Sequence, residues 1–230
     1  MKHDDQLEVI LSVLRHELGN SVNAVKITLD VLQENFDHFD DQKKRVYLER
    51  GSVLLERQNA LVQALKSYSK FNASSAAQVD ILTFWERFVE EARNLAAQHN
   101  ANLKVSSDLT ARHIVGDSLA LGKILDFILE NALEALPRDK SGRIELAAAE
   151  QDRHIALTVS DNGRGMDEDH LSKAVIPLFT TKPDKMGMGL PIVLKLLREM
   201  GGQLDIDSTP EKGTRVRIQL PKIDNSAAQS

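Results

Sequence analysis

The amino-acid sequence predicts an α+β multidomain protein, in which an antiparallel helical hairpin forms a dimeric four-helix bundle and a two-layer α/β sandwich follows. Three observations support this prediction. Apolar residues recur every three or four positions through the N-terminal part of the chain. A run of small polar residues then interrupts the pattern. Beyond it, helical segments are mixed with short strand-like segments.

The first predicted element is a long amphipathic helix, whose apolar stripe runs from Leu7 to Phe39. After an acidic turn at residues 37–41, a second stripe runs from Tyr47 to Tyr68 and predicts a helix antiparallel to the first. Two such helices cannot bury both stripes alone, so we expect the hairpin to form a homodimer. The alternative is an intramolecular coiled coil that packs on the rest of the chain.

The rest of the chain is predicted to form a separate α/β domain. The expected divisions are a hairpin domain at 1–72, a linker at 73–78, an α/β domain at 79–222 and a disordered tail at 223–230. The expected helices are 81–99, 118–136 and 191–200, and the expected strands are 103–106, 143–149, 154–161, 203–208 and 214–220.

The composition excludes several classes of function. With 34 acidic and 29 basic residues the net charge is −5, which gives no positive surface for nucleic acid. The chain has no cysteine, and this excludes disulfides and thiolate metal sites. No apolar run approaches the roughly 20 residues that span a bilayer, and the N-terminus is too polar for a signal peptide. We therefore expect a cytoplasmic protein without a membrane segment.

His16 is the first candidate functional residue. It lies about 200° around the helix from the apolar Leu14 and should face solvent. A neutral imidazole with one free lone pair is a good nucleophile. The adjacent Glu17 can accept the Nδ1 proton and leave Nε2 free to attack phosphorus, and Asn20 shares the same face of the helix. A solvated surface histidine is the simpler alternative.

Polar residues and glycines in the second domain indicate a nucleotide site. Asn131, on an expected helix, offers an amide oxygen to Mg²⁺ among ATP phosphates. Asp161 ends a strand and offers a carboxylate to the adenine amino group, while Gly163 and Gly165 permit a turn too tight for a Cβ. An ordinary surface Asn and an ordinary polar turn are the alternatives.

Gly187 and Gly189 precede a helix whose first turn contains Pro191. The exposed amides and the helix dipole there suit a phosphate group. The sequence contains no GxxxxGK[ST] loop and no GxGxxG after a first strand, which excludes a P-loop or a dinucleotide fold.

With these motifs the sequence resembles the two-component sensor histidine kinases, from about Leu7 to Pro221. Five motifs carry the resemblance: HELGN at 16–20 (the H box), LENA at 129–132 (N), DNGRG at 161–165 (G1), PLFTTK at 177–182 (F) and GMGL at 187–190 (G2). The resemblance implies a dimerisation and histidine-phosphotransfer hairpin followed by an ATP-binding domain of the Bergerat type, shared with gyrase, the Hsp90 chaperones and MutL.

The resemblance also implies residue roles. His16 would be the phosphoacceptor, Glu17 its acid/base partner and Asn20 the residue that assists dephosphorylation of a response regulator. Asn131 would bind Mg²⁺. The implied ATP-binding residues are Asp161, Gly163 and Gly165 at the adenine, Thr214 supporting Asp161 through a water, Gly187 and Gly189 as lid hinges, Phe179 as lid anchor, and Lys182 and Lys185 at the phosphates.

The implied activity is autophosphorylation of His16 from ATP and Mg²⁺, followed by transfer to an aspartate in a response regulator receiver domain, with regulator phosphatase activity in addition. The implied partners are a second copy of the chain, the cognate regulator and, if the chain is not an excised core, a separate sensor protein.

Three positions depart from the family pattern: Ser21 stands where Pro is usual, Phe127 replaces the earlier Asn of the N box, and Lys185 replaces the first Gly of the G2 triplet. The last two support an alternative, a phosphotransfer or scaffold protein with a degenerate ATP-binding domain. A serine kinase or ATPase of the same superfamily is a third hypothesis, but it would not need His16 beside Glu17.

Overall fold

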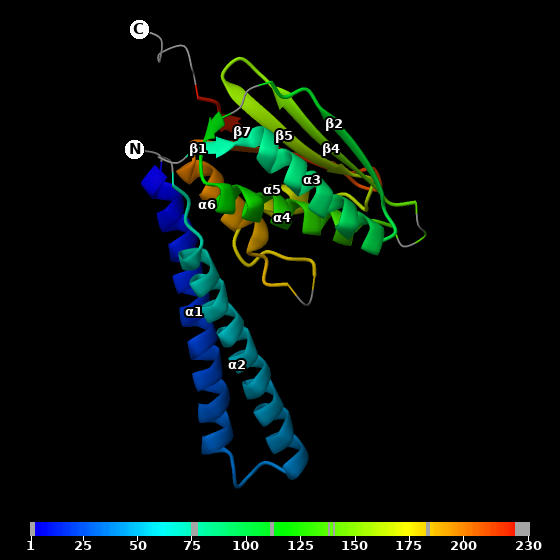
Figure 1. Cartoon of the computed structure of the whole chain (residues 1–230). Coiled ribbons are helices and arrows are strands. Elements are labelled where there is room, and N and C mark those ends of the chain that lie inside the picture. Colours follow the sequence, from blue (N-terminus) through cyan, green and yellow to red (C-terminus); the bar gives the residue numbers. More distant parts are fainter. Residues whose placement is uncertain are drawn as a thin grey trace. The chain divides into compact units, whose positions relative to one another are not determined.

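The computed structural model describes residues 3–74, 78–110, 113–137, 139, 141–182 and 185–223. Two compact units make up the chain (Figure 1): Met1–Lys70 with Ile176–Met188, and Phe71–Val175 with Gly189–Ser230.

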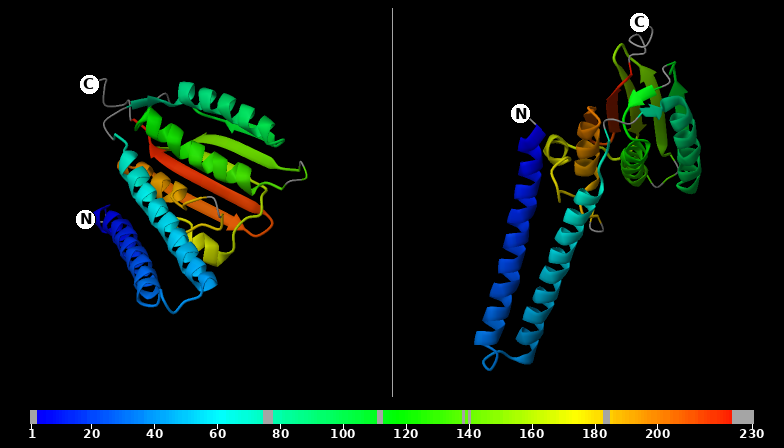
Figure 2. Two further views of the ribbon diagram at one scale, coloured as in Figure 1. Left: turned by 90° about the horizontal axis from the view of Figure 1, so that it is seen from below. Right: turned by 60° about the vertical axis from the view of Figure 1, so that its left-hand side comes forward.

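The first unit contains a helical hairpin. Helices α1 (His3–Glu34) and α2 (Asp41–Lys70) run antiparallel and side by side in both views (Figures 1 and 2). The predicted first helix ends earlier than its apolar stripe, because turns follow Glu34. Phe39 belongs to the connection instead, where its ring stacks on Tyr47 with centroids 5.3 Å apart. Among the hairpin residues whose side chains the structure describes, the buried ones are Ser21, Thr28, Leu32, Gly51, Leu61, Ala64 and Tyr68.

Large apolar side chains also lie on the outside of this hairpin. Their spacing is regular, since several follow one another at intervals of seven residues along each helix. The exposed members are Val22, Ile27 and Leu29 on α1, Phe36 in the turn that follows it, and Val46, Leu48, Val53 and Leu55 on α2. A repeat of seven is the pattern by which helices pack against partner helices.

The second unit is a five-stranded sheet with three helices against one face (Figure 2). The strand order is β2 (Asn102–Ser107), β4 (Arg143–Glu150), β5 (His154–Asp161), β7 (Gly213–Pro221) and β6 (Gln203–Thr209). Only the β2–β4 pair is parallel among these strands. The covering helices are α3 (Ile81–Gln98), α4 (Ser118–Ala135) and α6 (Gly189–Glu199).

The core of this unit lies between the helices and the inner face of the sheet. Alternate residues of β4, such as Ile144 and Leu146, are buried there. Helix α3 contributes Trp85, which is 4% exposed and packs beside Phe88. The indole Nε1 is buried without a hydrogen-bond partner in the described part of the chain.

The predicted fold class, a helical hairpin followed by an α/β domain, is confirmed, while the dimer stays a prediction. Three short elements were not predicted: β1 (Gln78–Asp80), β3 (His113–Val115) and α5 (Glu168–Lys173). Strands β1 and β3 pair antiparallel, so the last residue of the predicted linker begins β1. Linker residues 75–77 and tail residues 224–230 lie outside the described residues.

Candidate functional site

His16 lies on α1, and its side chain is 74% exposed. Its Nδ1 contacts the side-chain amide of Asn20, one helical turn later, at 3.1 Å. Glu17 Oε1 lies 4.0 Å from the same nitrogen, which is beyond hydrogen-bond distance. The structure therefore brings the three predicted H-box residues together, with Asn20 rather than Glu17 in contact with Nδ1.

Arg57 is an additional residue of this cluster that sequence reasoning missed. It comes from α2 and donates a hydrogen bond from Nη2 to Glu17 Oε2 at 3.2 Å. The two residues are 40 positions apart, so no local motif could have indicated the contact.

Asp161 is the last residue of β5, the central strand of the second unit's sheet. Its Oδ1 accepts hydrogen bonds from the backbone N–H groups of Gly163, at 2.8 Å, and Thr214, at 3.3 Å. Burial raises the pKa of the Asp161 carboxyl, against the lowering effect of these two hydrogen bonds. Thr214 thus contacts Asp161 directly through its backbone N–H, while the predicted support through a water stays a prediction.

The glycines that follow Asp161 lie where the backbone leaves no space for a side chain. A Cβ on Gly163 would lie 2.4 Å from the carbonyl oxygen of Ala135, at the end of α4. Gly165 has a φ of +63°, and its Cβ would lie 1.9 Å from the Thr209 oxygen. The backbone of the loop therefore packs directly against the end of α4 on one side and the β6–β7 turn on the other.

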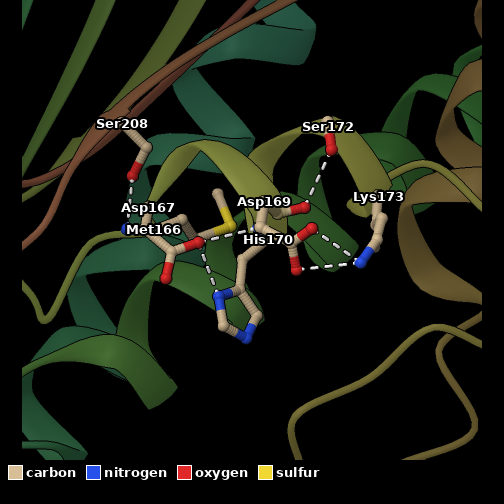
Figure 3. A network of polar contacts seen from close by, with 7 residues as sticks. All are labelled: Met166, Asp167, Asp169, His170, Ser172, Lys173 and Ser208. Carbon is tan, nitrogen blue, oxygen red and sulfur yellow. Dashed lines mark hydrogen bonds and ion pairs between the residues drawn. The ribbon is translucent and has the colours of Figure 1, made fainter.

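A chain of polar contacts holds the backbone after this loop (Figure 3). The Met166 N–H donates to Ser208 Oγ at 2.9 Å, and that hydroxyl lies 2.9 Å from Thr214 Oγ1. Ser208 was not predicted as a site residue. Asp167 then caps α5 by accepting from the His170 N–H at 2.8 Å.

Asn131 is half-buried on α4, in the second unit with Asp161. Gly189, the first residue of α6, lies close to it: a Cβ there would be 3.8 Å from Asn131 Nδ2 and 3.5 Å from Phe127. The structure therefore brings the N-box Asn and the second G2-box Gly together. Phe127 also packs edge-on against Phe71, with centroids 6.2 Å apart.

The segment Ile176–Met188 contains the remaining predicted residues. Gly187 has a φ of +66°, and a Cβ would lie 2.3 Å from the Phe179 carbonyl oxygen. The backbone at Gly187 therefore lies in close contact with the backbone at Phe179. Lys182 and Lys185 lie between them, with the Lys185 N–H donating to the Lys182 carbonyl at 3.3 Å.

The fold and this arrangement define a class of protein. Residues 116–224 match the family model for histidine kinase-, DNA gyrase B-, and HSP90-like ATPases. A structure of histidine kinase ThkA in complex with response regulator protein TrrA matches 96% of this chain and 64% of that chain, with a TM-score of 0.63 and 19% identity. The mycobacterial sensor histidine kinase MprB matches 64% of this chain and 97% of that chain, with a TM-score of 0.55 and 25% identity.

Curated relatives give the family. The C4-dicarboxylate transport sensor protein DctB of Pseudomonas aeruginosa is 30% identical over 94% of this chain and 36% of its own length. Sporulation kinase C of Bacillus subtilis is 35% identical over 90% of this chain and 47% of its own length. The chain is homologous, over nearly its whole length, to the catalytic core of sensor histidine kinases, which consists of a helical hairpin and an ATP-binding domain. It spans between about a third and a half of the curated relatives named here.

Within the described ranges, no helix combines the length and the apolar character that crossing a bilayer requires.

Proposed function

We propose that the chain is an ATP-dependent protein histidine kinase that phosphorylates its own His16 and passes the phosphoryl group to an aspartate of a response regulator. One observation carries the proposal: an exposed imidazole lies beside the Glu17 carboxylate on the hairpin of a chain that also contains an ATP-binding domain. No hydrogen bond to Nε2 occurs among the described residues, so that nitrogen can meet a phosphoryl group.

The chemistry requires the tautomer with the proton on Nδ1, so the Asn20 amide nitrogen, which can only donate to an unprotonated Nδ1, has to leave that position first. The Nε2 lone pair then forms the bond to the γ-phosphorus of ATP, and the bond from that phosphorus to the bridging oxygen breaks with its electron pair on ADP. Glu17 accepts the Nδ1 proton as the ring gains positive charge. In the second step the N–P bond breaks, and a carboxylate oxygen of the regulator takes the phosphoryl group.

The nucleotide would be held by residues of the second unit. Asp161 has one oxygen occupied by two backbone N–H groups, which leaves Oδ2 to accept from the adenine amino group. The glycines at 187 and 189 would let the lid segment close over the phosphates, with Phe179 at its base. Lys182 and Lys185 would contact phosphate oxygens.

The residues present suit a Mg²⁺ ion that is bound largely by its nucleotide. Among the described residues, no three His, Asp or Glu side chains form a metal site. Asn131 would supply one amide oxygen, and phosphate oxygens and water the rest, which is the usual arrangement for this ion. When bound, Mg²⁺ neutralises charge on the phosphates in the transition state.

The experiment is phosphorylation with γ-labelled ATP in the wild type, His16→Gln and the control His38→Gln, an exposed histidine in the hairpin turn. We expect an acid-labile, base-stable label in the wild type and the control, and none in His16→Gln. Full labelling of His16→Gln would reject the site. If the wild type neither binds nucleotide in a titration nor becomes labelled, the alternative of a degenerate ATP-binding domain is correct.

We further propose that Asn20 assists dephosphorylation of the regulator by positioning a water molecule. Its amide lies beside His16 and is exposed, so it can reach a docked receiver domain. Asn20→Ala should keep autophosphorylation while the phosphorylated regulator decays more slowly. Equal decay rates with the wild type and the variant would contradict this role.

The chain is also proposed to act as a homodimer. Exposed Leu and Val side chains recur at intervals of seven residues on α1 and α2, and they would be buried against the same surface of a second hairpin in a four-helix bundle.

A further inference from the structure

The Glu17 carboxylate lies between two groups of the hairpin. Its Oε2 accepts from Arg57 Nη2 at 3.2 Å, while its Oε1 is the oxygen nearest to His16 Nδ1, at 4.0 Å. Each carboxylate oxygen thus faces a different partner. A movement of about 1 Å would bring Oε1 within hydrogen-bond distance of the imidazole.

The helix alone does not provide this arrangement. Neighbouring residues on an α-helix point about 100° apart and do not face each other. Glu17 therefore needs a contact outside its own helix to hold its carboxylate near His16, and Arg57 on α2 supplies that contact. The guanidinium remains charged at any working pH and presents several N–H donors in a fixed plane.

The Glu17–Arg57 ion pair contributes little to the stability of the fold. The side chains are 66% exposed for Arg57 and 33% exposed for Glu17, and exposed pairs contribute between about 0 and 1 kcal/mol to folding. The constraint on the carboxylate is the more substantial effect of the contact.

We propose that Arg57 is a positioning residue for autophosphorylation, which anchors Glu17 Oε2 so that Oε1 can accept the Nδ1 proton of His16. The proposal rests on the proposed function, because it takes His16 as the nucleophile. In the arrangement observed, Asn20 contacts Nδ1. When Nε2 attacks phosphorus, Oε1 replaces this amide at Nδ1 and accepts the proton, while Oε2 stays with Arg57.

The first test is a double-mutant cycle on the autophosphorylation rate at saturating ATP. Arg57→Ala should lower the rate about tenfold, a fraction of what a general base contributes, and Arg57→Lys should restore part of it. In the Glu17→Gln background, Arg57→Ala should change the rate less than twofold, because Arg57 acts through Glu17. An undiminished tenfold loss in that background would overturn the proposal.

The matched control is Arg50→Ala, which removes an exposed arginine two helical turns earlier on α2. It should retain the wild-type rate. A loss as large as that of Arg57→Ala would assign the effect to general charge on α2 and reject a specific role for Arg57.

The second test does not depend on kinase activity. The ¹⁵N spectrum of the His16 ring in the unphosphorylated chain reports which nitrogen carries the proton. The Glu17 charge, held 4.0 Å from Nδ1, favours the proton on that nitrogen, so Arg57→Ala should lower the share of the Nδ1–H tautomer, and Arg50→Ala should not. If the wild type is never labelled, the proposed function fails, yet this spectrum still decides on Arg57: identical tautomer shares in all three proteins would contradict the positioning role.

Discussion

Asp161 combines burial with two backbone hydrogen bonds, and its raised pKa has a consequence for ATP binding. Between the ordinary carboxyl pKa and the raised value, the folded state holds the proton more tightly than the unfolded state, so this group destabilises the fold as pH rises. Asp161→Asn should therefore keep or raise the melting temperature.

The same substitution should weaken ATP binding by about ten- to a hundredfold at neutral pH, the equivalent of one charge-assisted hydrogen bond. Wild-type affinity should also fall as the pH is lowered toward the raised pKa, since a protonated carboxyl loses acceptor strength, and the affinity of Asp161→Asn should change less. Calorimetric titration with ATP over a pH series measures both effects. Equal affinities at pH 7 would exclude Asp161 from the adenine contact.

Ser21 is a buried polar residue of the hairpin that should lower the stability of the fold. It is 5% exposed, and its Oγ has no hydrogen-bond partner in the described part of the chain. Ser21→Ala should stabilise the hairpin by about 1 kcal/mol, because an unsatisfied buried hydroxyl is removed. Urea denaturation measures this, with exposed Ser52→Ala as the control that accounts for the higher helix propensity of Ala. A gain no larger than that of Ser52→Ala would contradict the expectation.

Individual residues of the site could be predicted from the sequence where a short motif or the helical period indicates them. The tight turn at Gly163 and Gly165 and the exposure of His16 follow from short motifs and helix periodicity, and the structure agrees with both. Arg57 and Ser208 could not be predicted in this way, because their partners are 40 and 42 residues distant in the sequence.

Among the elements, the segment Ile176–Met188, which we propose as the lid over ATP, owes its conformation to one glycine. Gly187 is left-handed, and its Cβ would collide with the Phe179 carbonyl, whereas a Cβ on Gly189 would make ordinary contacts with Phe127 and Asn131. Gly187→Ala should therefore cost about 1–3 kcal/mol in lid conformation and raise the KM for ATP about tenfold or more. Gly189→Ala should change KM less than threefold. Similar KM values for the two variants would show that lid geometry does not limit binding.

The elements that sequence predicted are those with long periodic patterns. Helices α1, α2, α3 and α4 each extend over five or more turns and carry clear apolar stripes. Strands β1 and β3 have three residues each and α5 has six, which is too short for periodicity to be detected. Their formation depends on pairing and capping with neighbours.

For the whole molecule, the exposed apolar surface of the hairpin predicts self-association. Leu29 is 48% exposed and lies within the seven-residue repeat of α1. Leu29→Glu should place a charge in the proposed interface and shift a dimer toward monomer in sedimentation equilibrium, while Lys26→Glu, at an exposed polar position, should not. A wild type that is monomeric at micromolar concentration would exclude the dimer.

The buried Trp85 gives the molecule an internal probe, because it is the chain's only tryptophan. Its fluorescence reports the unfolding of the second unit alone, whereas far-ultraviolet circular dichroism reports the helices of both units. Coincident transitions would mean that the two units unfold cooperatively. Separate transitions would give each unit its own stability, so that the effects of Ser21→Ala and Asp161→Asn could be assigned within the intact chain.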